Sequence, residues 1–403
     1  MSAAPVSATT TPIPLSTRTL VLMAATCGLC AGANYFNQPL LHSIAQKLGV
    51  HDGQAASIVT LAQVSYAFGL LLLVPLGDML ERRRLVLSLM VLAAIGMALS
   101  GLSGPSHSFA LLALGTGMTG LFSVAAQVLV PMAASLAAPG TSGRAVGLVM
   151  SGLLIGILAA RSVAGVLSGL GGWNAVYGVG AVATLAMAVL LARALPTAPV
   201  AVRLGYGAVL RSLGQLWRQY PRLRSRALIG GLGFATVSVL FSTMALLLAG
   251  PAYGLNDTQI GLIGIVGIAG ALMANVAGRM ADRGREQATT LAGGLLMLLG
   301  WALLWQGGHS LWAFLLGFLV VDGALQALHI SNQNVVYALE PQARSRINAV
   351  YMTTYFVGAA GGSAVGAWAW LQAGWGGASL AGGTLGLLTL AVVLRDQRLA
   401  RAG

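Results

Sequence analysis

Two residues of opposite charge lie inside long apolar segments of the sequence. Asp322 falls within residues 310–339, and Arg161 falls within residues 145–168. If these segments cross a membrane, each buried charge costs at least about 2.5–3.5 kcal/mol on insertion scales and normally faces a cavity or a partner. Two hypotheses follow: either Asp322 accepts a proton while Arg161 holds it ionised, or the two form a permanent buried ion pair that only fixes packing.

Polar residues accompany Asp322 along its own segment. Asp322, Gln326, His329 and Gln333 stand at i, i+4, i+7 and i+11, which places them on one stripe of a helix. Four polar groups aligned in an apolar helix indicate a face that reaches water. Shorter pairs at i, i+4 occur in three other segments: Asn34 with Gln38, Ser123 with Gln127, and Ser238 with Ser242. These residues are predicted to form polar faces within the apolar segments. A histidine such as His329 is by itself more typical of a hydrogen-bonded core residue, and its place on the stripe makes a cavity role equally possible.

No motif in the sequence indicates a cofactor, a metal or an enzymatic reaction. Gly115–Gly120 fits the dinucleotide fingerprint by letter, but no strand precedes it and it lies within an apolar segment. Cys27 and Cys30 have the spacing of a redox pair, yet both also lie in an apolar run. A polytopic membrane enzyme would need a His/Asp cluster at a membrane face, which the sequence does not suggest. We therefore predict no cofactor and no catalytic residues.

The composition predicts that helices crossing a membrane must position these residues. The 403 residues are 57% hydrophobic and 8% charged, and the mean hydropathy is +0.83. A soluble domain carries about a quarter charged residues, so a soluble globular protein is excluded. A membrane-spanning helix needs about 20 apolar residues. Twelve segments qualify: 19–41, 54–77, 85–103, 108–136, 145–168, 174–193, 226–250, 257–280, 288–306, 310–339, 347–371 and 376–394.

The basic residues predict the orientation of these spans. With the N-terminus inside, 20 of the 22 Lys and Arg residues fall in cytoplasmic segments, leaving Lys47 outside and Arg161 within a span. This distribution follows the positive-inside rule and predicts a multi-pass membrane protein with both termini in the cytoplasm. The basic residues behind the net charge of +13 then set the orientation of the helices and bind anionic lipid head groups. Nucleic acid is therefore not an expected partner.

The chain divides into two similar halves. Asp78 and Asp282 are 204 residues apart, whereas Arg144 and Arg346, like Trp173 and Trp375, are 202 residues apart. Parallel repeats of this kind place a substrate path along their interface. The expected organisation is a disordered cytoplasmic tail at 1–18, a six-helix bundle at 19–193, a central cytoplasmic loop at 194–225, a second bundle at 226–394 and a tail at 395–403.

The residues around the two aspartates resemble a known family motif. Gly278 to Arg285 is similar to the loop motif of the major facilitator superfamily, one residue short, and Asp78 to Arg84 keeps its aspartate and arginines. Within the superfamily the chain is most similar to bacterial drug:proton-antiporter-like members. Asn37 to Gly49 resembles their first-helix motif, and the glycines of 145–168 resemble their glycine-rich motif, although Ala160–Arg161 replaces the usual Gly-Pro.

The resemblance implies a fold, a function and a set of gating residues. The fold is all-α, with twelve transmembrane helices in two pseudo-symmetric six-helix bundles. Helices one, four, seven and ten line the central cavity, so the polar residues named above in those four segments are expected to line a substrate cavity. The function is secondary transport by alternating access, with proton-coupled efflux of a small molecule as the expected mode; a proton symporter or a facilitator for uptake is the alternative. We expect a monomer. Asp78 and Asp282 can meet positively polarised helix N-termini across the cytoplasmic side, or they are simply solvated loop acids. The implied gating set is Asp78, Arg82, Arg83, Gly278, Asp282 and Arg283.

Overall fold

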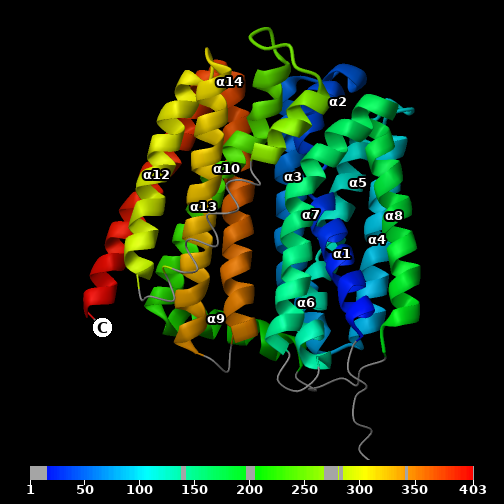
Figure 1. Cartoon of the computed structure of the whole chain (residues 1–403), viewed down its shortest axis with the longest axis vertical. Coiled ribbons are helices and arrows are strands. Elements are labelled where there is room, and N and C mark those ends of the chain that lie inside the picture. Colours follow the sequence, from blue (N-terminus) through cyan, green and yellow to red (C-terminus); the bar gives the residue numbers. More distant parts are fainter. Residues whose placement is uncertain are drawn as a thin grey trace, which may run out of the picture.

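The computed structural model describes residues 16–137, 142–196, 205–266, 280, 285–340 and 344–402. Within these ranges the regular structure is helical, and the helices form two groups that stand side by side (Figure 1). The first group contains α1 (Thr17–Ala33), α2 (Leu41–Leu48), α3 (Asp52–Leu72), α4 (Arg82–Leu102), α5 (Phe109–Phe122), α6 (Ala125–Leu136), α7 (Ser142–Gly171) and α8 (Trp173–Ala194). The second contains α10 (Pro221–Ala249), the helix Asp257–Val266, α12 (Glu286–Gln306), α13 (Leu311–Leu339) and α14 (Arg344–Ala402).

Ten of the described helices are long and apolar enough to cross a membrane. The last of them, α14, is two helices joined at a break, where Ala373 and Gly374 leave helical geometry and Gly374 adopts a φ of 54°. This break separates the two spans predicted at 347–371 and 376–394. Asp257–Val266 is the described part of the span predicted at 257–280. The all-helical membrane architecture predicted from composition is confirmed.

The span predicted at 19–41 is not one continuous helix. The chain leaves α1 after Ala33 and passes through a turn and the short 3-10 helix η1 (Gln38–Leu40) before entering α2. Pro39 explains the interruption, because its ring clashes with the carbonyl group four residues earlier and it lacks an N–H donor. The span predicted at 108–136 is similarly divided into α5 and α6 at Ser123–Val124.

Close helix crossings repeat in the two halves. A Cβ atom added to Gly156 in α7 would lie 2.1 Å from Cα of Gly28 in α1. A Cβ atom added to Gly358 in α14 would lie 2.1 Å from the carbonyl oxygen of Gly231 in α10. Gly156 and Gly358 are 202 residues apart, which is the spacing of the sequence landmarks. Glycine at both crossings lets the helix backbones touch.

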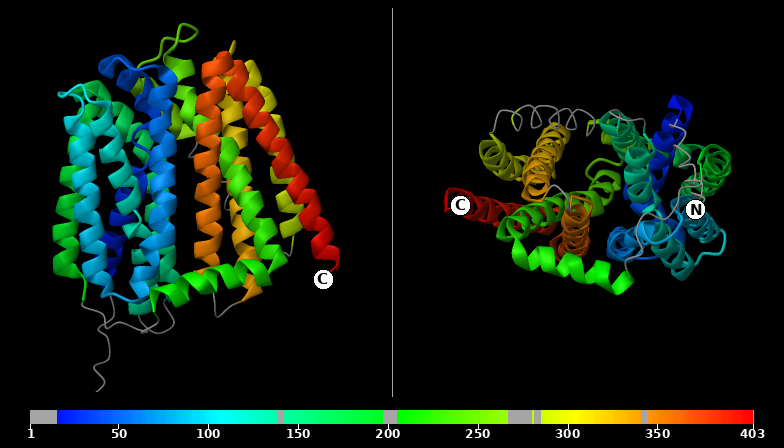
Figure 2. Two further views of the ribbon diagram at one scale, coloured as in Figure 1. Left: turned by 180° about the vertical axis from the view of Figure 1, so that it is seen from behind. Right: turned by 90° about the horizontal axis from the view of Figure 1, so that it is seen from below.

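The connection between the halves contains a further helix. α9 (Tyr206–Gln219) lies across the ends of the helix groups in Figure 2, and its Tyr206 hydroxyl donates a hydrogen bond to the Leu72 carbonyl at 2.9 Å. We call this end of the molecule the α9 face and the opposite end, which carries α2, the α2 face. At the C-terminus, α14 continues to Ala402, and its Asp396 is fully buried.

Candidate functional site

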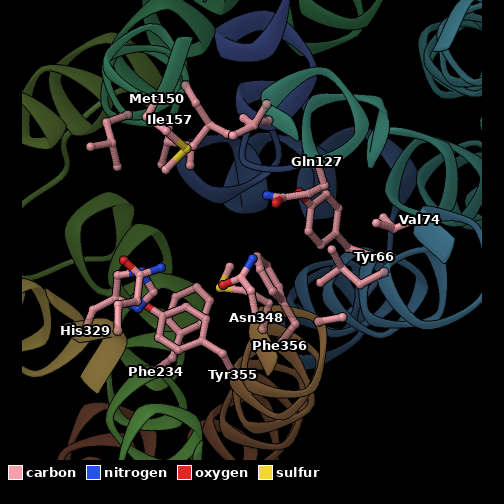
Figure 3. A pocket seen from close by; sticks show the side chains of 18 of the residues that line it. Tyr66, Val74, Gln127, Met150, Ile157, Phe234, His329, Asn348, Tyr355 and Phe356 are labelled. Atoms are coloured by element: carbon pink, nitrogen blue, oxygen red, sulfur yellow. The ribbon is translucent and has the colours of Figure 1, made fainter. Parts of the chain in front are cut away.

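A cavity of about 550 Å³ lies between the two halves. Figure 3 shows its wall, with Gln127 and Tyr66 from the first half facing His329 and Tyr355 from the second. The lining runs from Arg161 deep in the molecule to residues near the α9 face: Gly77, Arg82, Leu213, Arg346 and Asn348. This volume lies within the range of small-molecule sites, which is about 300–1,000 Å³.

Arg161 lies at the deep end of the cavity and is held by uncharged groups. Its Nε donates a hydrogen bond to Oε1 of Gln38 at 2.6 Å, and only 5% of the residue is exposed. The guanidinium carbon lies 3.8 Å from the ring centroid of Phe241 and 5.0 Å from that of Tyr35. An arginine over aromatic faces gains cation–π attraction, which increases when the contact is desolvated. These contacts fix the cation at the inner end of the cavity.

Asp322 lines the same end of the cavity and is equally buried. It stands 11 residues into α13 from the α2 face, and Arg161 stands 10 residues before the end of α7 at that face. At a rise of about 1.5 Å per residue, the two lie at nearly the same depth, about 15–17 Å from the α2 face. They do not form a hydrogen-bonded ion pair, and Oδ2 of Asp322 has no hydrogen-bond partner among the described residues. The cavity wall therefore carries a carboxylate with one buried oxygen that no hydrogen bond satisfies.

Four of the residues predicted for the cavity lie in its wall: Gln127, Gln326, His329 and Gln333. Gln127 Nε2 donates a hydrogen bond to the Tyr66 hydroxyl at 3.4 Å. His329 Nδ1 and the Tyr351 hydroxyl are 3.1 Å apart, which orients the imidazole. The stripe predicted along residues 310–339 therefore faces one continuous cavity.

Five other predicted cavity residues lie behind the wall: Asn34, Gln38, Ser123, Ser238 and Ser242. Asn34 and Gln38 do not share a helix face, because the chain breaks between α1 and η1. Ser123 lies in the break after α5 and donates to the Thr119 carbonyl at 2.6 Å, whereas Ser242 donates to the Val239 carbonyl at 3.0 Å. Ser238 accepts a hydrogen bond from Gln63 at 3.2 Å. Gln38 acts on the cavity only through Arg161.

Sequence reasoning missed a row of aromatic rings along the cavity. The ring centroids of Tyr66 and Phe356 are 4.4 Å apart, and those of Phe234 and Tyr355 are stacked at 4.2 Å. Tyr355 also lies 4.8 Å from the His329 ring. The row joins α3 of the first half to α10, α13 and α14 of the second. Spacing along one helix cannot reveal it, because a core aromatic and a cavity aromatic have the same periodicity.

Asp257 forms an inter-half contact at the α2 face that no motif or spacing in the sequence indicates. Its carboxylate accepts hydrogen bonds from Ser168 of α7 at 2.5 Å and from Ser43 of α2 at 2.7 Å. Beside it, Gly165 and Gly261 bring α7 and the helix Asp257–Val266 into backbone contact. On the other side of the interface, the hydroxyls of Thr60 and Ser363 are 2.9 Å apart. The halves are therefore closed together at the α2 face.

The expected gating residues are only partly described. Arg82 donates from Nε to the Gly77 carbonyl at 2.9 Å and from its terminal nitrogen to Ser135 at 3.1 Å. Arg83 donates to the Ala192 carbonyl. Gly278, Asp282, Arg283 and the side chain of Asp78 lie outside the described residues.

A family model called Major Facilitator Superfamily matches residues 23–307 and 227–402. The chain belongs to this superfamily. It is 48% identical over 378 residues to the uncharacterized transporter YgaY of Escherichia coli O157:H7, which covers 94% of this chain and 95% of that protein. It is 28% identical over 296 residues to a chloramphenicol resistance protein of Streptomyces lividans, covering 73% of this chain and 72% of that one.

Solved structures of the superfamily have the same fold. A bacterial homologue of the human lysosomal transporter Spinster, in an inward-facing and occupied conformation, superposes with a TM-score of 0.77 at 13% identity, covering 95% of this chain and 97% of that one. This major facilitator protein is accordingly a multi-pass membrane protein and a secondary transporter, not an enzyme.

Proposed function

We propose that this chain exports a small molecule across the bacterial inner membrane in exchange for protons. The α9 face is the cytoplasmic face in this proposal, because the basic residues gather in the segments that lie there. Both termini are then cytoplasmic, and the cavity is the inward-facing one. The chain works as a monomer whose basic loops meet anionic head groups.

The observation that carries the proposal is the unpartnered Oδ2 of Asp322 at the deep end of the cavity. A proton and a substrate group compete for the same buried carboxylate, so the site holds one or the other. In this proposal, the positive charge of Arg161, at the same depth, holds the carboxylate ionised until one of them arrives. Competition of this kind couples outward movement of substrate to inward movement of protons.

Alternating access in this proposal exchanges closure at one face for closure at the other. The contacts of Asp257 hold the α2 face shut in the inward-facing state. When they separate, Asp78 and Asp282 can approach the helix starts near Asn348 and Ala145 and close the α9 face, because helix N-termini attract carboxylates. Arg82, Arg83, Gly278 and Arg283 flank that closure.

The names of relatives support export. The relative from Streptomyces lividans is described as a chloramphenicol resistance protein, and resistance is what removal of a compound from the cell would produce. Its identity to this chain is 28%, so it supports the direction of transport and not a particular substrate.

The experiment uses inside-out membrane vesicles with an acidified lumen. Compounds are added outside while lumenal pH is followed in wild type and in Asp322→Asn. An exporter that exchanges substrate for protons raises the lumenal pH when its substrate is added, and Asp322→Asn abolishes this rise. Asp52→Asn, which neutralises an acid outside the cavity, is the matched control and keeps the response.

The same assay separates the alternatives. A proton symporter running in reverse would carry protons into the lumen with the substrate and lower the lumenal pH. A facilitator would equilibrate a labelled compound without any pH change, and Asp322 with Arg161 would then be a structural feature of the cavity.

A further inference from the structure

We infer that the cavity takes an uncharged amphipathic molecule, with a flat apolar body and a hydrogen-bond donor that reaches the carboxylate of Asp322. The inference rests on the proposed function, since it names the substrate class of the same cavity. Three independent features of the site lead to it: the charge balance at the deep end, the free acceptor and the shape of the walls.

The charge balance disfavours a charged substrate group at the deep end. Asp322 and Arg161 both line the cavity there and both are 95% buried, so a third group equally distant from them meets two charges that cancel. A cation attracted by the carboxylate is repelled by the guanidinium, and an anion meets the reverse. Either ion would lose its hydration free energy without a net electrostatic gain in return. An uncharged group avoids this desolvation cost.

The free acceptor calls for a donor on the substrate. The carboxylate of Asp322 lines the cavity, its Oδ2 has no hydrogen-bond partner among the described residues, and an unsatisfied buried acceptor costs free energy. A hydroxyl or amide N–H on the substrate can donate to this carboxylate without bringing charge. Farther along the cavity the polar lining includes uncharged amides, on Gln127, Gln326 and Asn348. They can donate to or accept from the remaining polar groups of such a molecule.

The walls define the body of the substrate. One side is the aromatic row from Tyr66 through Phe356 and Phe234 to Tyr355. Figure 3 shows Met150 and Ile157 of α7 on another side of the same space. A flat ring system fits between aromatic faces and an aliphatic surface, because both contacts bury apolar area without needing polar partners.

The test compares four probes that share a naphthyl body: naphthylethanol, its methyl ether, naphthylpropanoate and naphthylethyl-trimethylammonium. Binding to the purified full chain is measured by ligand-induced thermal stabilisation, which rises with concentration relative to the dissociation constant. We expect the alcohol to bind at least about tenfold more tightly than the ether, the carboxylate or the ammonium probe, because only it donates a hydrogen bond to a carboxylate.

Two variants then move the charge balance in opposite directions. Asp322→Asn leaves Arg161 uncompensated, so the preference shifts to naphthylpropanoate. Arg161→Gln leaves Asp322 uncompensated, so the preference shifts to the ammonium probe, and this variant keeps the test decisive if the first one fails to fold. Asp52→Asn makes the same charge change outside the cavity and keeps the wild-type ranking.

Each result decides the inference. It is overturned if wild type binds a charged probe as tightly as the alcohol, if no probe binds, or if the ranking is the same in both cavity variants. The outcome is separable from that of the proposed function. If the probes bind in the expected order but no substrate moves protons in the vesicle assay, proton coupling is refuted and the substrate class stands. If only charged compounds drive proton exchange, the substrate class is refuted and proton coupling stands.

Discussion

Asp257 accepts a hydrogen bond from Ser168 at 2.5 Å, and this contact joins the two halves of the transporter at the face away from the cavity mouth. The same carboxylate accepts a second bond from Ser43, so one acidic residue holds two helices of the opposite half. Hydrogen bonds to an ionised group are roughly twice as strong as neutral ones. Asp257 is therefore placed to stabilise closure of the α2 face over opening.

Removing Asp257 is expected to favour opening of the α2 face. In a background with Cys27 and Cys30 replaced, cysteines at Thr60 and Ser363 report closure, because the two hydroxyls are 2.9 Å apart. Asp257→Ala should lower the rate of disulfide formation between them severalfold, whereas Asp52→Ala, at the same face, should leave it unchanged. Equal rates in both variants would show that Asp257 does not hold the face shut.

Gly156 is expected to tolerate no side chain. A Cβ atom there would lie 2.1 Å from Cα of Gly28, so Gly156→Ala forces α1 and α7 apart. Overpacking of this kind costs about 1–3 kcal/mol, and the Tm of the purified protein should fall. Gly147→Ala in the same helix is the control, since nothing lies within 4 Å of its added Cβ. A similar Tm for both variants would contradict a close backbone contact between α1 and α7 at Gly156.

The buried ion pair between Arg226 and Asp396 is expected to stabilise the second half. The two groups are 2.7 Å apart and neither residue is exposed, while Arg226 also donates to Thr290 at 2.7 Å. Asp396→Asn leaves an uncompensated buried charge, which typically costs about 3–5 kcal/mol. Differential scanning calorimetry should show a large loss of Tm. The exposed pair of Arg84 with Glu81 is the comparison, and Arg84→Gln should change the Tm little.

Replacing Arg161 by lysine is expected to weaken ligand binding in the cavity, although the positive charge is kept. Lysine cannot reproduce both the 2.6 Å bond to Gln38 and the flat contact with Phe241. Binding of naphthylethanol should weaken several-fold, measured by the same thermal stabilisation. Arg84→Lys, whose exposed side chain lies outside the cavity, should leave the affinity unchanged. Wild-type affinity in Arg161→Lys would mean that charge alone matters at this position.

The sequence by itself determined the membrane class, the all-helical architecture and the approximate limits of most of the spans that the structure describes. These follow from local composition: a segment of about 20 apolar residues has few alternatives to a spanning helix. The stripe from Asp322 to Gln333 could also be predicted from the sequence. α13 is one uninterrupted helix, so regular helical spacing is enough to place the other three residues on the same face as Asp322.

Only the tertiary structure decided which polar residues reach the cavity and what surrounds them. Pro39 interrupts the first span, so Asn34 and Gln38 leave the face that helical spacing assigns to them. The aromatic row and the contacts of Asp257 join residues more than 80 positions apart, such as Ser168 and Asp257. No periodicity along a single helix encodes such contacts, because they depend on how the helices of the two halves pack against one another.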